Sequence, residues 1–212
     1  MKWILFDLDG TLLDTSALIE ASLRYVLLTQ GFDTEEIRHL TWGRPLREVL
    51  RELCPGRERA ALDTYQEFYR QNRHMVEIFP GIRATLDRLA QAGYPMAIVT
   101  NKSSEPARED LRSHQLTEFF SAFVGRGEVL HPKPHPEPVL QALESLSACP
   151  LETLMVGDTR WDMMAGRGAG VRTGAALWGP DPGSIHSWGS ADYSFHKPAE
   201  ILHLFPGASG HT

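Results

Sequence analysis

Two carboxylates near the start of the chain, Asp7 and Asp9, have the type and spacing needed for phosphoryl transfer. The Asp7 carboxylate could attack phosphorus and form an aspartyl phosphate. Asp9 could protonate the leaving alkoxide and then activate water. Gly10 would let the chain turn close to a ligand, and Thr11 offers a hydroxyl or a backbone N–H to phosphate. Residues 7–11 are also compatible with a plain Asp-Gly turn after a strand, so the interpretation depends on what lies near them.

Two further aspartates suggest how a phosphate could approach these carboxylates. Two carboxylates facing a phosphate dianion would repel it, and a hard cation would remove that repulsion. Mg²⁺ takes oxygen ligands and is commonly held by one or two carboxylates together with phosphate. Asp158 is the natural additional ligand. Asp162, one helical turn later, could order a metal-bound water or hold a lysine. It would also suit a helix N-terminus.

Candidate phosphate-binding residues come from two other segments. Thr100 and Asn101 follow an apolar run and could donate to phosphate oxygens, or could cap the next helix. Lys133 lies in HPKPHP, residues 131–136, where alternating prolines predict a stiff, extended segment. A lysine on such a segment is a fixed positive charge for phosphate and phosphoaspartate. The two histidines of this segment are expected to be ordinary loop residues.

The elements that must position these residues alternate between apolar runs and helical patterns. Apolar runs typical of buried strands cover residues 3–6, 95–99, 122–124, 153–156 and 174–177. Helical patterns cover residues 82–92, 104–114, 139–146 and 162–167. This alternation predicts an α/β fold with a parallel sheet and helices on both faces. Ligands bind at the carboxyl ends of parallel strands, so Asp7, Thr100 and Asp158 should meet at one edge.

The segment of residues 14–80 has a different pattern. It shows no strand pattern, and its helical stretches cover about residues 17–29, 34–40, 45–53 and 57–74. The sequence therefore predicts a core of residues 1–13 and 81–212, with a helical domain of residues 14–80 inserted after the first strand.

Composition narrows the class of partner and the compartment. The chain has 212 residues, a net charge of −6 and no basic stripe, so nucleic acid and anionic membrane are poor partners. No apolar run approaches the roughly 20 residues that a membrane helix needs. Cys54 and Cys149 lack metal-type spacing and are expected to be reduced thiols. We expect a soluble, cytoplasmic protein, either monomer or homodimer.

Four motifs resemble those of the haloacid dehalogenase superfamily and occur in its order. They are DLDGTLLDT from Asp7, TNK from Thr100, Lys133 within KPHPEP, and GDTRWD from Gly157. The resemblance implies a Rossmann-like core, a four-helix cap formed by residues 14–80, dependence on Mg²⁺ and an aspartyl-phosphate intermediate.

The resemblance also implies a role for each matching position. Asp7 would be the nucleophile and a metal ligand, and Asp9 the general acid and base, with its backbone carbonyl on the metal. Thr100 and Lys133 would hold phosphate. Asp158 would bind the metal, and Asp162 would support the site. An acid at the position of Asp9 argues against a dehalogenase, which lacks one there.

The TNK and KPHPEP motifs look most like those of phosphoglycolate phosphatases, so 2-phosphoglycolate is the expected substrate. Residues 42–47 resemble the specificity loop of this cap type, and Arg44, with Arg47, could pair with a substrate carboxylate or be solvated. Pyrophosphate, nucleotides and sugar phosphates remain open as substrates. A phosphomutase of β-phosphoglucomutase type and a catalytically silent phosphate-binding or regulatory protein are the alternative functions.

Overall fold

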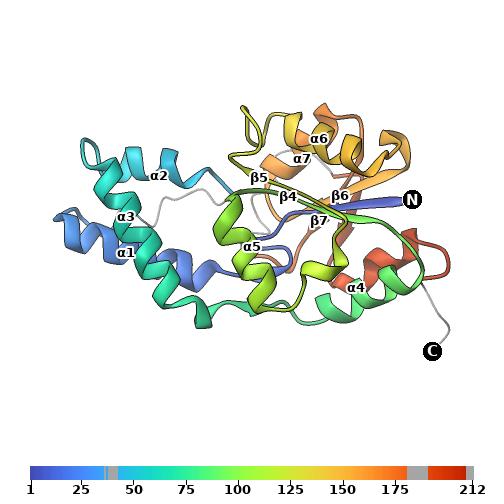
Figure 1. Ribbon diagram of the computed structural model, residues 1–212, viewed down its shortest axis with the longest axis horizontal. Coiled ribbons are helices and arrows are strands. Elements are labelled where there is room, and N and C mark those ends of the chain that lie inside the picture. Colours follow the sequence, from blue (N-terminus) through green and yellow to red (C-terminus); the bar gives the residue numbers. More distant parts are fainter. Residues whose placement is uncertain (36, 38–42, 181–190, 209–212) are drawn as a thin grey trace. The chain divides into compact units, whose positions relative to one another are not determined.

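The computed structural model describes residues 1–35, 37, 43–180 and 191–208 (Figure 1). The chain divides into two compact units. The core unit contains Met1–Asp14 and Ile78–Thr212, and the inserted unit contains Thr15–Glu77. The inserted unit therefore begins after Asp14 of the core unit and ends before Ile78 of the core unit.

A six-stranded sheet forms the centre of the core unit, in the order β5-β4-β1-β6-β7-β8. The strands are β1 (Trp3–Phe6), β4 (Met96–Ser103), β5 (Ala122–Arg126), β6 (Thr153–Gly157), β7 (Arg172–Ala176) and β8 (Tyr193–Phe195). Every neighbouring pair is parallel. The predicted α/β fold with a parallel sheet is thereby confirmed.

Helices cover both faces of this sheet, which explains why its central strands are continuously apolar. The helices α6 (Glu137–Leu146) and α7 (Arg160–Gly168) lie on one face, and α4 (Ile82–Gln91) and α5 (Ser104–Ser113) on the other (Figure 1). Under α6 and α7, one cluster of buried side chains joins four strands and both helices; it includes Leu5, Val99, Val124, Met155, Val139 and Ala165. Burying each larger aliphatic side chain contributes about 1.5–3 kcal/mol, so these contacts fix the strands relative to one another.

The register of the central strands determines which residues share the carboxyl edge of the sheet. Phe6 at the end of β1 lies opposite Ile98 of β4 and Val156 of β6. The residues that follow these three positions, among them Asp7, therefore emerge at the same edge.

Apart from Glu77 at its end, the regular elements of the inserted unit are helical over its described residues. It contains α1 (Ser16–Gln30), α2 (Leu46–Leu53), α3 (Glu58–Gln71) and the 3₁₀-helix η2 (Arg73–Met75). Gly31 ends α1 in a left-handed conformation with φ 76°, which suits glycine. The helix expected near residues 34–40 falls mostly on residues outside the described part, so the four-helix cap stays a prediction.

Several short elements differ from the expectation. A two-stranded ribbon of β2 (Leu13–Asp14) and β3 (Glu77–Ile78) joins the two points where the insertion begins and ends. Two-residue strands are too short to give an alternating pattern, which is why no strand was expected there. The 3₁₀-helices η3 (Thr117–Phe119), η4 (Pro150–Glu152) and η5 (Pro198–Leu204) and the short strand β8 were not predicted either. Strand β4 runs past its apolar part to Ser103, with an irregularity after Val99.

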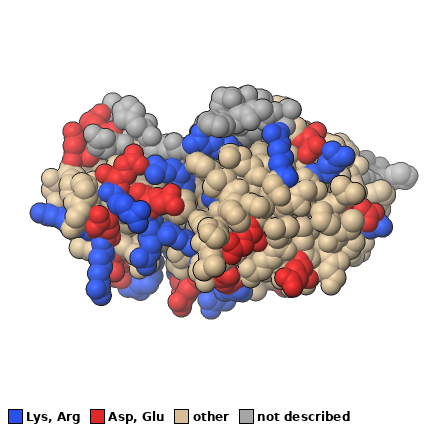
Figure 2. All heavy atoms as spheres, turned by 90° about the horizontal axis from the view of Figure 1, so that it is seen from above, with Lys and Arg blue, Asp and Glu red and all other residues tan. Residues whose placement is uncertain are grey.

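The surface carries both signs of charge. On the face shown in Figure 2, Lys and Arg side chains alternate with Asp and Glu, and no continuous basic area is visible among the described residues of that face. No helix in the described part of the chain is long and apolar enough to cross a membrane.

Candidate active site

Asp7 lies directly after β1 at the carboxyl edge of the sheet. Its backbone N–H donates to the carbonyl of Val156 at 2.9 Å, which continues the pairing of β1 with β6. The residue is only 5% exposed. A short buried strand that stops at Phe6 thus presents one carboxylate at a fixed place on the sheet edge.

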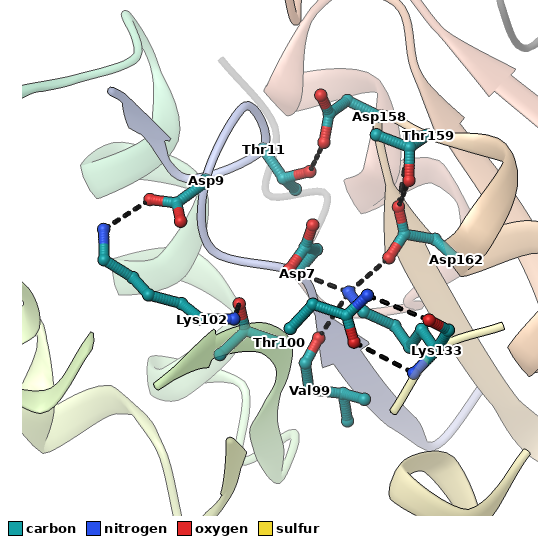
Figure 3. A network of polar contacts seen from close by, with 11 residues as sticks. Asp7, Asp9, Thr11, Val99, Thr100, Lys102, Lys133, Asp158, Thr159 and Asp162 are labelled. Atoms are coloured by element: carbon teal, nitrogen blue, oxygen red, sulfur yellow. Dashed lines mark hydrogen bonds and ion pairs between the residues drawn. The ribbon is translucent and has the colours of Figure 1, made fainter. Parts of the chain in front are cut away.

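Lys133 brings the positive charge to this carboxylate (Figure 3). Its Nζ lies 2.9 Å from Asp7 Oδ1 and 2.5 Å from Asp162 Oδ1, and donates to the carbonyl of Val99 at 2.9 Å. The side chain is 2% exposed. The structure therefore brings together residues that the sequence places far apart, and the predicted fixed charge lies against the predicted nucleophile.

Asn101 holds the backbone of Lys133. Its Nδ2 donates to the Lys133 carbonyl, and its Oδ1 accepts from the Lys133 N–H, both at 2.9 Å. This contact gives Asn101 a positioning role that the sequence did not predict, and phosphate binding by Asn101 stays a prediction. Thr100, the neighbouring residue, is buried, and its hydroxyl oxygen accepts from the N–H of Lys102 at 3.2 Å.

Asp158 lies at the end of β6, where two glycines leave room for its carboxylate. Thr11 donates its hydroxyl to Asp158 Oδ1 at 3.0 Å. A Cβ built on Gly10 would lie 2.1 Å from Asp158 Oδ2, and one on Gly179 would lie 2.6 Å from Asp158 Cβ. The close approach, together with φ 78° at Gly10, requires glycine at this turn. The hydroxyl of Thr11 is thus engaged with a carboxylate, and its predicted contact with phosphate is untested.

Asp162 has two functions in this structure. At the start of α7 it forms a capping box, in which its Oδ2 accepts from the N–H and the hydroxyl of Thr159 at 3.0 and 2.7 Å. Its other oxygen holds Lys133. Of the two roles expected beyond helix capping, ordering a metal-bound water or holding a lysine, the structure shows the second.

Burial and mutual repulsion shift the ionisation of these groups. Burial, together with the nearby charges of Asp162 and Asp9, raises the pKa of Asp7 to about 7, although Lys133 acts in the opposite direction. Burial and the charges of Asp7 and Asp162 hold the pKa of Asp158 well above its usual range. Burial alone would lower the pKa of Lys133, but the two neighbouring carboxylates outweigh it and raise that pKa.

The carboxylates fit a divalent cation. Oxygens of Asp7, Asp158 and Asp162 lie within 4.8 Å of one another, and all three residues are buried. Both oxygens of Asp162 are engaged by Lys133 and Thr159, which leaves Asp7 and Asp158 with the greater capacity to bind a cation. Among the described residues Asp7 Oδ1 accepts no hydrogen bond, although it is ion-paired with Lys133 at 2.9 Å. Burial and the neighbouring carboxylates raise the pKa values of both residues, so the site holds an excess of buried negative charge. A bound cation would neutralise that charge.

Asp9 is held by Lys102, which in turn contacts Asp110, and the sequence assigned no role to either of these two partners. Lys102 Nζ lies 2.8 Å from Asp9 Oδ1 and 2.6 Å from Asp110 Oδ2, and Asp110 lies on α5. Lys102 is part of the TNK motif, but nothing in the sequence pairs it with a residue of the following helix. Only the side-chain geometry reveals this contact.

Arg44 belongs to the inserted unit. Its Nη1 lies 2.8 Å from Glu52 Oε2, an ion pair within that unit. Substrate binding by Arg44 stays a prediction. Trp42, which precedes it in the stretch interpreted as a specificity loop, lies outside the described residues.

The two histidines flanking Lys133 lie together with Glu137. His131 Nδ1 is 2.7 Å from Glu137 Oε2, and the same carboxylate accepts from the N–H groups of Leu130 and His131 at 2.8 and 3.0 Å. His135 Nδ1 in turn accepts from the N–H of Glu137 at 3.2 Å. These contacts order the loop that carries Lys133, so the expectation of ordinary loop residues agrees with their hydrogen bonds.

The fold is of the Rossmann-like α/β class, with a buried cluster of carboxylates at the carboxyl edge of its sheet. The model of the haloacid dehalogenase-like hydrolase family matches residues 4–176. A pyrophosphatase PpaX from Bacillus velezensis is 35% identical over 205 residues, covering 95% of this chain and 94% of that protein. Another pyrophosphatase PpaX, from Anoxybacillus flavithermus, is also 35% identical over 205 residues, with 95% of each chain covered.

Solved structures agree with this relationship. A candidate phosphoglycolate phosphatase from Lactobacillus plantarum has a TM-score of 0.86 and 26% identity, with 96% of this chain and 99% of that chain covered. A haloacid dehalogenase-like family hydrolase from Streptococcus pneumoniae has a TM-score of 0.84 and 29% identity, with 97% and 98% covered. The chain belongs to the haloacid dehalogenase-like hydrolases, as the four motifs predicted.

Proposed function

We propose that this hydrolase is a Mg²⁺-dependent phosphatase that uses Asp7 as a covalent nucleophile on a small phosphorylated metabolite. The observation that carries the proposal is the buried Asp7 carboxylate at the end of β1, ion-paired with Lys133 at 2.9 Å and close to Asp158. A buried carboxylate with a fixed cation and room for a metal suits attack on phosphorus.

The first step transfers the phosphoryl group to the protein. An Asp7 carboxylate oxygen forms a bond to phosphorus, and the bond from phosphorus to the leaving oxygen breaks. Asp9 gives its proton to that oxygen, so the product leaves as an alcohol. Lys133 and the hydroxyl of Thr100 hold the phosphoryl oxygens, whose negative charge is stabilised by the buried ammonium.

The second step returns the enzyme to its starting state. Asp9, now ionised, takes a proton from water as the water oxygen attacks phosphorus. The bond between phosphorus and Asp7 breaks, and inorganic phosphate leaves. Mg²⁺ bound by Asp7, Asp158 and the backbone carbonyl of Asp9 would neutralise charge that develops on the phosphoryl oxygens.

For the substrate, we propose 2-phosphoglycolate first and pyrophosphate second. The TNK and KPHPEP motifs favour 2-phosphoglycolate. The relatives named pyrophosphatase, at 35% identity over nearly the whole chain, favour pyrophosphate. In either case the inserted helical unit would act as a cap that selects the leaving group and excludes water, with Arg44 on the substrate anion.

We also propose that the enzyme acts in the cytoplasm as a monomer or homodimer on free metabolites, without nucleic acid or membrane. The mixed charge of the face in Figure 2 supports the absence of a polyanion partner. Cys54 and Cys149 are both free, which suits a reducing compartment.

The test is release of inorganic phosphate from 2-phosphoglycolate, pyrophosphate, a sugar phosphate and a nucleotide, with Mg²⁺ or with EDTA. We expect wild-type turnover with Mg²⁺ and loss of at least about 1,000-fold in Asp7→Asn, because the amide is not a nucleophile. Asp63→Asn, on the exposed surface of the inserted unit, is the matched control and should keep full activity.

Each outcome has a distinct meaning. Turnover of pyrophosphate alone would keep the mechanism and replace the substrate. Slow phosphate loss together with isomerisation of a sugar phosphate would favour a mutase. Phosphate binding without turnover of any compound would favour the silent binding protein and overturn the proposal.

A further inference from the structure

Lys102 links the proposed acid and base, Asp9, to a buried carboxylate on the neighbouring helix. Its Nζ lies 2.8 Å from Asp9 Oδ1 and 2.6 Å from Asp110 Oδ2. The Lys102 side chain is 11% exposed and that of Asp110 is 0% exposed. Figure 3 shows Lys102 reaching Asp9 on the side away from Lys133 and Asp162. The lysine therefore lies in the surroundings of the site, beside the proposed acid and base.

The contact with Asp110 fixes a side chain that is otherwise flexible. A lysine has a four-carbon stem and loses about 2 kcal/mol of rotamer entropy when it is held in one place. A fully buried carboxylate needs a charged partner, since leaving it unpaired costs several kcal/mol. Asp110 on α5 therefore holds the Lys102 ammonium at a defined position before any substrate binds.

The contact with Asp9 then fixes a carboxylate that would otherwise avoid the substrate. A phosphate dianion next to Asp7 would repel the charged form of Asp9, and the Asp9 side chain is 24% exposed, with room to turn toward water. An ammonium on Oδ1 opposes that rotation and leaves the second carboxylate oxygen to exchange the proton. Proton transfer requires this orientation, because donor and acceptor must lie within hydrogen-bond distance.

We propose that Lys102, anchored by Asp110, is a positioning residue that holds Asp9 for proton transfer to the leaving group. The inference rests on the proposed function. It goes beyond that function because it gives Lys102 and Asp110 a role in one catalytic step. The two residues set the position of Asp9, and neither of them touches the reacting atoms. The effect of removing Lys102 should therefore depend on the leaving group. An ester with a poor leaving group needs the proton from Asp9, and an ester with a good leaving group does not.

The experiment measures kcat/KM for two kinds of ester with the full-length protein and Mg²⁺. The alkyl ester is the one that wild type hydrolyses fastest among 2-phosphoglycolate, glycerol 3-phosphate and glucose 6-phosphate. The aryl ester is p-nitrophenyl phosphate, which has a good leaving group. The variants are Lys102→Met, Lys102→Arg and Asp110→Asn, with Lys2→Met as the control, since Lys2 makes a 2.8 Å ion pair with Glu152 on an exposed surface.

We expect Lys102→Met to lower kcat/KM on the alkyl ester by about 30–100-fold and on the aryl ester by no more than about 3-fold, since general-acid assistance contributes about 10²–10⁴-fold. Lys102→Arg should recover most of the loss. Asp110→Asn should also lower kcat/KM more on the alkyl ester than on the aryl ester, but by a smaller factor. Lys2→Met should leave both values unchanged.

Three results with the variants would overturn the inference. An equal loss on both esters would mean that Lys102 serves only the general structure, which a lowered Tm would accompany. An increase of kcat/KM in Lys102→Met would mean that the lysine holds Asp9 away from the substrate. Unchanged kcat/KM on both esters would show that Lys102 has no role in the reaction. If wild type hydrolyses none of the four esters, the inference fails, and the proposed function fails as well when pyrophosphate is not hydrolysed either.

Discussion

At the scale of single residues, Lys133 supplies the positive charge that faces the buried carboxylates of the site. One ammonium contacts Asp7 and Asp162 and donates to a strand carbonyl, and all of these groups are buried. Asn101 fixes the lysine's backbone from β4 through two hydrogen bonds. The site is thus held by contacts between segments that are distant in sequence, and one side chain supplies positive charge to two of its buried carboxylates.

Replacing Lys133 by Met should therefore damage both activity and stability. Phosphate release should fall by at least about 100-fold, because the stabilising charge on the phosphoryl oxygens is lost. The free energy of unfolding should fall by about 3–5 kcal/mol near pH 7, since two buried carboxylates lose their cation. Urea unfolding and the phosphate assay measure the two effects. Lys197→Met, at an exposed lysine of the same unit, should change neither; a Lys133→Met protein with wild-type turnover would contradict the role.

The sequence allows prediction of some residues of the site and not of others. Asp7, Thr100 and Asp158 follow apolar runs, so strand ends alone predict that they meet. The pairs of Lys102 with Asp110 and of Asn101 with the Lys133 backbone depend on side-chain distances across separate segments. No spacing rule encodes those distances, and the polar residues involved are equally common in solvated loops.

At the scale of elements, the turn after β1 is what allows the carboxylates to approach one another. Gly10 has φ 78°, and a Cβ there would lie 2.1 Å from Asp158 Oδ2. The sequence identified this glycine as the one that lets the chain turn near a ligand. It did not identify Asp158 as the group that occupies the space of the missing side chain.

Gly10→Ala should therefore lower the free energy of unfolding by more than backbone strain alone would. Gly93 is the matched control, because it has φ 77° but no atom within 4 Å of a Cβ built there. Gly93→Ala should lower the free energy of unfolding by about 1 kcal/mol, from the left-handed conformation alone. Gly10→Ala should lower it by about 2–4 kcal/mol, and should weaken Mg²⁺ binding because Asp158 must move. Equal losses in the two variants, with unchanged Mg²⁺ affinity by calorimetry, would show that Asp158 tolerates displacement.

The same scale shows where element prediction succeeds. Strands buried on both faces and helices of ten or more residues have strong patterns, and those of the core unit were found within a few residues of their observed bounds. Two-residue strands and 3₁₀-turns are set by tertiary contacts, so β2, β3 and η5 carry no local pattern. The extension of β4 to Ser103 runs through polar residues, where an apolar run gives no signal.

For the whole molecule, the fold brings more buried negative charge to the site than its lysine neutralises. Between about pH 4 and pH 7 the folded protein without metal keeps a proton on Asp7 that the unfolded chain releases, because the pKa is about 7 in the folded state and 3.8 in the reference state. The folded state then binds more protons, so this contribution to stability declines as pH rises through that window. Asp158, whose pKa is also raised, acts in the same direction.

Mg²⁺ should reverse this dependence, because it favours the ionised carboxylates that bind it. At a concentration about 100 times its Kd, Mg²⁺ should stabilise the fold by about 2.7 kcal/mol, equivalent to about 5–11 °C in Tm for a protein of this size. The Mg²⁺-induced rise in Tm should be small at pH 5 and largest near pH 8, as calorimetric scans at each pH would show. Asp158→Asn should remove most of that rise, whereas Asp63→Asn should keep it. A rise in Tm that is independent of pH, or that persists in Asp158→Asn, would mean that Mg²⁺ stabilises the protein from somewhere other than the buried carboxylates at the end of the sheet.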